Sequence, residues 1–242
     1  MDWNRQIDGY CERIDFSFWS EPVNAITNAG FVVAAAWMWQ RCAGVTMARV
    51  LCVILFTIGI GSFLFHSYAT QWAALADVVP IGVFILLYLF LVNRDVVGMK
   101  GWQALLATAL FFPYAALLVP VLDRIPFLRV SDFYWTVPIL LFVYGALLRK
   151  RVPQTARGLV IGGLILCVSI SLRSVDEALC DHVPIGTHFL WHVLNAVMLG
   201  WMIETYRRHQ VPARRHLNPA RPGMGFGMDN VQGRGQAGGS GA

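Results

Sequence analysis

Long apolar runs alternate with short polar segments along most of this chain. A helix needs about 20 residues to cross a hydrocarbon core of about 30 Å, and seven apolar runs reach or approach that length. The sixth run is the shortest, but neighbouring helices can supply polar partners that lipid lacks. The pattern predicts an all-α membrane protein, a bundle of seven transmembrane helices. The seven runs cover residues 22–40, 49–65, 72–92, 102–121, 133–148, 159–172 and 187–206.

Composition supports a membrane protein, because 57% of the residues are hydrophobic and only 14% are charged, against about 25% charged in soluble proteins. Residues 1–21 are polar and acidic, without the basic and apolar regions of a cleaved signal peptide. We expect them to stay on the chain, outside the membrane. Residues 22–206 would form one bundle, since the linkers are short. Residues 207–242 are basic and rich in glycine and proline, a composition typical of disorder.

Positive charge is distributed unevenly between the two ends of the predicted helices. Seven spans would place 14 of the 19 lysines and arginines on one side of the membrane. Because short basic loops stay in the cytoplasm, we expect the amino terminus outside and the carboxy terminus in the cytoplasm. The net charge of +5 mostly reflects this bias. It gives little support to nucleic-acid binding, which needs basic residues on one folded face.

Five polar residues interrupt the apolar sequence near one end of the predicted bundle. Ser62 and His66 share a helix face because they are one turn apart, and His188 and His192 repeat that spacing in the last helix. Asp77 lies at the start of the third helix. All of these helix ends fall on the outer side in the predicted orientation, so we expect the five residues to meet there. In a bacterium this would be the periplasmic side of the inner membrane.

These residue types match a catalytic zinc centre. Two histidines at i and i+4 bind one zinc ion in other helical sites, and a third imidazole leaves one tetrahedral position open for water. Asp77 could move a proton from that water to a leaving group, and Ser62 could donate a hydrogen bond to an oxyanion. Each residue alone has a simpler explanation, such as a serine packed between helices or an aspartate that favours a helix dipole. Together they favour a metal hydrolase whose substrate arrives from the membrane plane.

Three spacings carry a resemblance to a known family: Ser62-x-x-x-His66, Asp77 eleven residues further on, and His188-x-x-x-His192. They resemble the alkaline ceramidases, seven-helix lipid amidases in a wider group that includes adiponectin receptors. The resemblance extends over residues 8–206 and includes the segment before the first helix. It implies that the three histidines bind zinc and that Asp77 and Ser62 assist catalysis. The implied reaction cleaves ceramide, or a related N-acyl lipid, to a fatty acid and a sphingoid base.

The family also has a calcium site in its amino-terminal segment, and the resemblance implies Asp8, Glu12 and Glu21 as its ligands here. Calcium takes about 6 to 8 oxygen ligands. Gly9 stands where the family has an aspartate, so Asp8 would have to replace that ligand by a one-residue shift. Ile14 occupies a position that is usually polar. The alternatives are a weaker calcium site or a merely solvated acidic segment.

Two of the five cysteines, Cys11 and Cys180, are expected on the outer side of the membrane. An oxidising compartment would allow a disulfide between them. Such a bond would tie the acidic segment to the loop before His188. Two free thiols are the alternative.

Three functions stay open on the sequence alone. The first is a zinc-dependent amidase that acts on ceramide or another N-acyl lipid. The second is an ester-cleaving hydrolase of the phospholipase type. The third is a lipid receptor without enzymatic activity, in which zinc only stabilises the bundle and Asp77 would have little use beside the metal.

Overall fold

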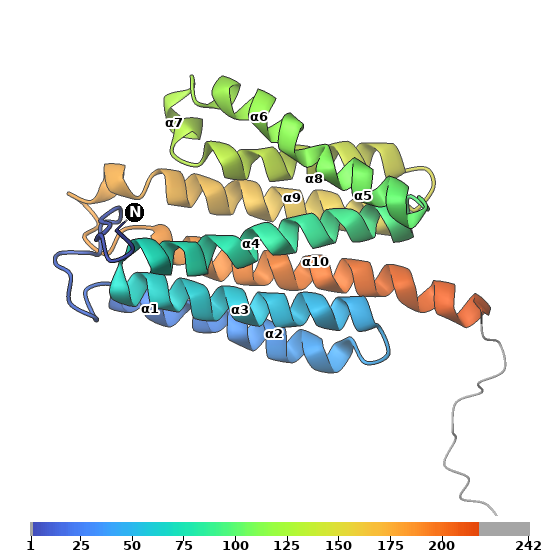
Figure 1. Ribbon diagram of the computed structural model, residues 1–242, viewed down its shortest axis with the longest axis horizontal. Coiled ribbons are helices and arrows are strands. Elements are labelled where there is room, and N and C mark those ends of the chain that lie inside the picture. The colour runs from blue at the N-terminus through green and yellow to red at the C-terminus, as the bar shows by residue number, and fades with distance from the viewer. Residues whose placement is uncertain (1, 218–242) are drawn as a thin grey trace, which may run out of the picture.

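The computed structural model describes residues 2–217, with the side chains of residues 2–211. This part of the chain is helical, and its only β-type pairing is an isolated bridge between Gln6 and Thr70. The long helices lie side by side along the long axis of the molecule, with the amino-terminal segment at one end (Figure 1). The α-helices are α1 (Pro22–Thr27), α2 (Ala29–Arg41), α3 (Thr46–Tyr68), α4 (Gln71–Leu91), α5 (Gly101–Ala109), α6 (Phe111–Leu122), α7 (Pro126–Arg129), α8 (Asp132–Leu148), α9 (Pro153–Ser174) and α10 (His188–Leu217). A π-helical turn, η1 (Val92–Val96), follows α4, and a 3-10 turn, η2 (Glu177–Leu179), follows α9.

The predicted apolar runs all fall in helical segments, but the ends differ in informative ways. The run 102–121 is divided into α5 and α6 at Leu110, because Pro113 has no N–H for the carbonyl of Ala109. The run 159–172, the shortest prediction, is the middle of the longer helix α9. Helix α10 continues to Leu217, past the predicted end at residue 206. The rest of the predicted tail, residues 218–242, lies outside the described residues.

Four helical stretches of the described chain are long and apolar enough to cross a membrane. Helix α8 is apolar but shorter. Large apolar side chains face outward on several helices, including Trp37, Leu117 and Leu147, and a surface of this kind is unusual for a soluble monomer. The helices therefore indicate insertion into a membrane. The four stretches are Thr46–Tyr68, Gln71–Val96, Gly101–Leu122 and Pro153–Ser174.

Helices α3 and α4 form a tight antiparallel pair at the end of the bundle near the amino-terminal segment. Ala69, with φ of 47° in the left-handed region, ends α3 and turns the chain back into α4. Further along, Gly61 of α3 lies against the backbone of Ala76, where a Cβ would come within 2.0 Å of the carbonyl oxygen. Pro80 has no N–H to donate to that carbonyl. The two backbones can therefore approach closely beside Ser62, the residue that follows Gly61.

Candidate metal centre

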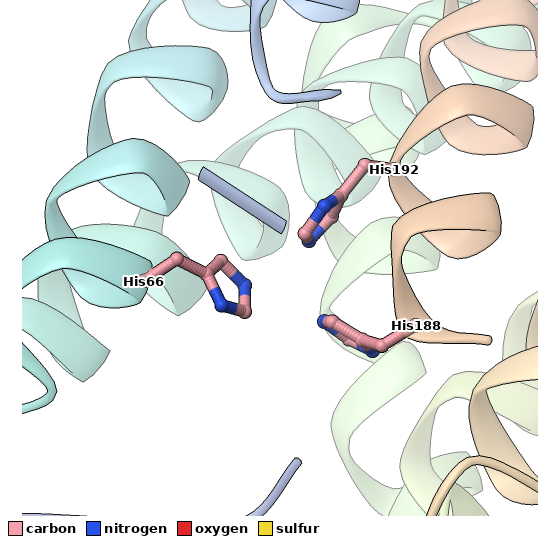
Figure 2. A group of neighbouring side chains, drawn as sticks. All are labelled: His66, His188 and His192. Carbon is pink, nitrogen blue, oxygen red and sulfur yellow. The ribbon is translucent and has the colours of Figure 1, made fainter. Parts of the chain in front are cut away.

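Three histidines from two helices meet at this end of the bundle. His66 comes from the last turn of α3, and His188 and His192 come from the first two turns of α10. One ring nitrogen from each lies within 4.8 Å of the others, and all three side chains are buried. Figure 2 shows the three rings turned toward one another. Within the described part of the chain, this is the one group of histidine, cysteine and acidic side chains arranged to hold a metal ion.

Two of the three rings have a hydrogen-bond partner at Nδ1, and two ring nitrogens of the group have none. His66 Nδ1 lies 2.6 Å from Glu21 Oε2, and His192 Nδ1 lies 3.0 Å from the Thr27 hydroxyl. His66 Nε2 and His188 Nδ1 are buried and have no hydrogen-bond partner among the described residues. Buried polar atoms are nearly always paired in folded proteins, and ligand histidines usually bind a partner through the second ring nitrogen. The arrangement therefore fits a metal ion held by three imidazoles.

Ser62 and Asp77 lie next to each other, as the close contact of α3 and α4 at Gly61 allows. The Ser62 hydroxyl interacts with the Asp77 carboxyl, which also lies within electrostatic range of His66. Asp77 Oδ1 is buried without a hydrogen-bond partner in the described chain. A carboxylate with a free oxygen beside a metal centre is suited to accept a proton.

Ser62 and Asp77 also line one end of a cavity whose walls are mainly apolar. The cavity follows α4 from Asp77 to Val92, and its far part is lined by Tyr144 and Met202. Asp77 and Val92 are about 22 Å apart along a helix that rises 1.5 Å per residue. A long, mainly apolar cavity therefore extends into the bundle from Ser62 and Asp77.

The amino-terminal segment covers the histidines from the end of the bundle. The Tyr10 ring stacks on His188 with ring centroids 3.7 Å apart. Next to it, Cys11 forms a disulfide with Cys180, with Cα atoms 5.1 Å apart. This is the pair of cysteines expected on the outer side of the membrane. The bond holds Tyr10 near the loop that leads into α10.

Asp176 fixes the start of α10, and the sequence analysis did not identify it. Its Oδ1 accepts hydrogen bonds from the backbone N–H groups of Thr187 and His188 at 2.5 and 2.8 Å, and its Oδ2 accepts one from Cys11. A carboxylate at this position satisfies N–H groups that a helix start leaves free. The usual sequence signal for such a cap is an aspartate directly before the helix. However, Asp176 and Thr187 are 11 positions apart, which is too far for a local capping pattern.

Of the three residues proposed as calcium ligands, Glu12 and Glu21 already have other hydrogen-bond partners. Both Glu12 oxygens accept backbone N–H groups at the start of α1, from Val23 and Asn24, at 2.6 and 2.8 Å. Asp8 is exposed at the surface. Gly9, next to Asp8, has no side chain that could bind an ion. The residues present do not fit calcium in this arrangement.

Glu21, the third proposed calcium ligand, serves the histidine centre instead. Its Oε1 accepts a hydrogen bond from Arg13 Nε at 2.5 Å, while its Oε2 lies next to His66 Nδ1 and the Asn24 amide. Burial acts to raise the pKa of the Glu21 carboxyl, but the hydrogen bond and charge of His66, with Asn24 and Arg13, lower it below the usual value. Glu21 is thus an ionised carboxylate behind a histidine. No local pattern in the sequence could reveal this role, because His66 is 45 residues away.

Comparison with known families agrees with this geometry. The sequence model of one family, described as Ceramidase, matches residues 7–216. Among curated proteins, none matches the chain at a significant level. The matched range contains the amino-terminal segment, all three histidines, Ser62 and Asp77.

Proposed function

Because the chain belongs to the ceramidase family, which implies a hydrolase with a lipid substrate, we propose that it is a zinc-dependent amidase of ceramide or a related N-acyl lipid. The observation that carries this proposal is the position of three buried imidazoles beside a carboxylate at the end of an apolar cavity. A metal used only to stabilise the bundle would not need a carboxylate with a free oxygen next to it.

The donor set favours zinc among the common metal ions. Three neutral imidazoles suit zinc, whereas calcium and magnesium prefer oxygen ligands. His66, His188 and His192 would hold the ion, with Glu21 and Thr27 orienting two of the rings from behind. When bound, zinc would acidify a water molecule and polarise the carbonyl of the substrate.

Asp77 and Ser62 would perform the proton transfer and the charge stabilisation. Asp77 takes a proton from the attacking water through its free Oδ1 and returns it to the amine as the carbon–nitrogen bond breaks. The water oxygen forms the new bond to the carbonyl carbon, which gives a fatty acid and a free sphingoid amine. The Ser62 hydroxyl, which interacts with Asp77 in the free protein, donates a hydrogen bond to the oxyanion on the carbonyl.

The cavity suits the acyl chain of such a substrate. Its lining consists mainly of large apolar side chains from α4, α8, α9 and α10, with few polar groups beyond the catalytic pair. An extended acyl chain placed there would leave its carbonyl at the polar end, near Asp77. Ligand sites of this type combine apolar walls with a few polar groups that fix orientation.

A lipid panel tests this proposal directly. Purified protein should release fatty acid from ceramide and other N-acyl lipids faster than from O-acyl lipids of the same chain length. Asp77→Asn should keep the metal and the fold while turnover falls by about 10² to 10⁴, and Ser62→Ala should lose about 10² to 10³. Hydrolysis of esters alone would point to a phospholipase. Equal turnover by wild type and Asp77→Asn would remove Asp77 from the mechanism.

We propose further that seven helical rods span the membrane, with α1–α2 and α5–α6 each acting as one, and that the histidine end faces outward. The bias of lysine and arginine supports this orientation. In a background without Cys42, Cys52 and Cys167, an impermeant thiol reagent on intact cells should label Asn4→Cys but not Ser240→Cys. The opposite labelling would reverse the topology.

A further inference from the structure

Arg13 is a buried arginine in the acidic amino-terminal segment. Its side chain is only 1% exposed, and the Glu21 side chain next to it is 3% exposed. The guanidinium donates hydrogen bonds to three oxygens: Glu21 Oε1 at 2.5 Å, the Asp15 carbonyl at 2.9 Å and the His66 carbonyl at 2.9 Å. One buried cation thus joins the amino-terminal segment to the last turn of α3.

These three acceptors are a carboxylate and two backbone carbonyls, which are the oxygen types that calcium binds in proteins. The guanidinium already occupies them and carries the positive charge that the buried Glu21 needs. A divalent ion beside Arg13 would meet like charge. Its other expected ligands are also lost, since Glu12 caps α1 and Ile14 is an apolar side chain with 88% exposure.

Arg13 also acts on the histidine centre through Glu21. The carboxylate that accepts the Arg13 hydrogen bond through Oε1 contacts His66 Nδ1 through Oε2 at 2.6 Å. Because Glu21 contacts Nδ1, the ring is held by one nitrogen, while His66 Nε2 has no hydrogen-bond partner among the described residues and could bind a metal ion. Without the hydrogen bond from Arg13, the buried Glu21 side chain would lose a contact that fixes its position, and its contact with the His66 ring would weaken.

We propose that the Arg13 guanidinium is the resident cation of the amino-terminal segment, takes the place of the calcium ion expected from the family, and positions His66 through Glu21. Arg13 is then a positioning residue, whereas the histidines are the ligands. Because a side-chain cation cannot dissociate, this connection between segment and metal centre is independent of the calcium concentration. The positioning role depends on the proposed metal centre, but the replacement of calcium does not.

The first experiment measures calcium binding to the purified full chain. Calorimetric titration with calcium chloride should give no binding heat in the millimolar range, and thermal unfolding should occur at the same temperature with and without calcium. Calcium binding that raises the unfolding temperature of the wild type, and that Glu12→Gln abolishes, would overturn the proposal. This measurement requires neither a variant of Arg13 nor any enzymatic activity.

The second experiment measures zinc affinity by competition with a chromophoric chelator. Arg13→Gln removes the charge and should weaken zinc binding by about 10-fold to 100-fold, as loss of an orienting partner does in other zinc sites. Arg13→Lys keeps the charge and should retain most of the affinity. Arg5→Gln changes an exposed arginine of the same segment, bonded to Gln71, and is the matched control that should bind zinc like the wild type. Equal zinc affinity in Arg13→Gln and Arg5→Gln would disprove the positioning role.

A double-mutant comparison separates the path through Glu21 from general damage. Glu21→Gln should weaken zinc binding as Arg13→Gln does, and the double variant should lose little more than the weaker-binding single variant, because both act through one contact. Additive losses would show that Arg13 acts on the centre independently of Glu21. If the wild type binds zinc but hydrolyses no lipid, the proposed reaction fails while these affinity results still decide the role of Arg13.

Discussion

The two ends of the helical bundle differ in whether their buried polar side chains have hydrogen-bond partners. At the histidine end, His66 Nε2, His188 Nδ1 and Asp77 Oδ1 are buried without hydrogen-bond partners among the described residues. An unsatisfied buried polar atom costs about 1–3 kcal/mol. Three such atoms from three different helices line the same region, and each belongs to a group able to bind a metal or a proton.

At the opposite end, charged and polar groups are paired with one another. Glu204 accepts hydrogen bonds from Arg41, Arg207 and Arg208, at distances from 2.7 to 3.5 Å. The Tyr206 hydroxyl donates to Asp95 Oδ2 at 2.5 Å. These polar groups mainly satisfy one another and stabilise the packing of helices.

One atom at this second end departs from the pattern. Arg49 Nε has no hydrogen-bond partner within the described chain, but its guanidinium lies over the Trp39 ring, 4.8 Å from the centroid. A cation over an aromatic face is itself a favourable contact. Several unpaired titratable atoms in one region therefore mark the functional site, whereas a single unpaired atom does not.

The largest expected effect comes from removing a histidine at the first end. His188→Ala should abolish lipid hydrolysis and reduce the bound metal to a small fraction of the wild-type content, because two imidazoles hold zinc far less well than three. Elemental analysis of the purified protein and a fatty-acid release assay measure the two quantities. His209→Ala, whose ring contacts Thr155 and the Asp95 carbonyl, is the matched control at the other end and should keep both. Full metal content in His188→Ala would refute the ligand set.

A smaller effect is expected from the helix contact that positions Asp77. Gly61→Ala would bring a Cβ within 2.0 Å of the Ala76 carbonyl oxygen and 3.1 Å of the Asp77 nitrogen. The helices must separate, which should destabilise the fold by about 1–3 kcal/mol. A shift of about 1 Å at Asp77 can cost about 10² in turnover.

The control for this variant is another glycine of the same helix pair. A Cβ added at Gly82 in α4 would meet no neighbouring atom within 4 Å, so Gly82→Ala should lower neither thermal stability nor turnover. Thermal unfolding in detergent and the hydrolysis assay compare the two variants. If Gly61→Ala behaves like Gly82→Ala, close approach of α3 and α4 does not position the carboxylate.

The smallest effect on activity is expected at the paired end. Glu204→Gln removes the charge that three arginines share, and loss of these charge-assisted hydrogen bonds should cost about 1.5–3 kcal/mol of stability. Turnover and metal content should stay within about twofold of the wild type, since Glu204 lies about 18 Å along α10 from His192. A large loss of turnover at unchanged stability would show that the two ends are coupled.

Local rules in the sequence are sufficient to predict the helical segments and the shared helix face of His188 and His192. Apolar runs of membrane-spanning length predicted the helical segments, because each helix satisfies its own backbone hydrogen bonds and needs only an apolar surface. His188 and His192 could be placed on one face from their spacing alone, since a helix repeats every 3.6 residues. The apolar pattern predicts one continuous run over residues 102–121, and it does not predict the break at Leu110 that Pro113 causes.

Contacts between distant segments could be decided only by the tertiary structure. Glu21 and Asp176 were not recognisable as partners of His66 and His188 from local sequence, because each pair is joined across a loop or between separate helices. The resemblance implies calcium as the partner of Glu21, whereas in the structure Glu21 binds Arg13, which the sequence shows only as an arginine in a polar segment. Spacing determines which side chains share a helix face. Which faces meet, and which buried charge neutralises another, depends on how closely the helices pack, as Gly61 shows.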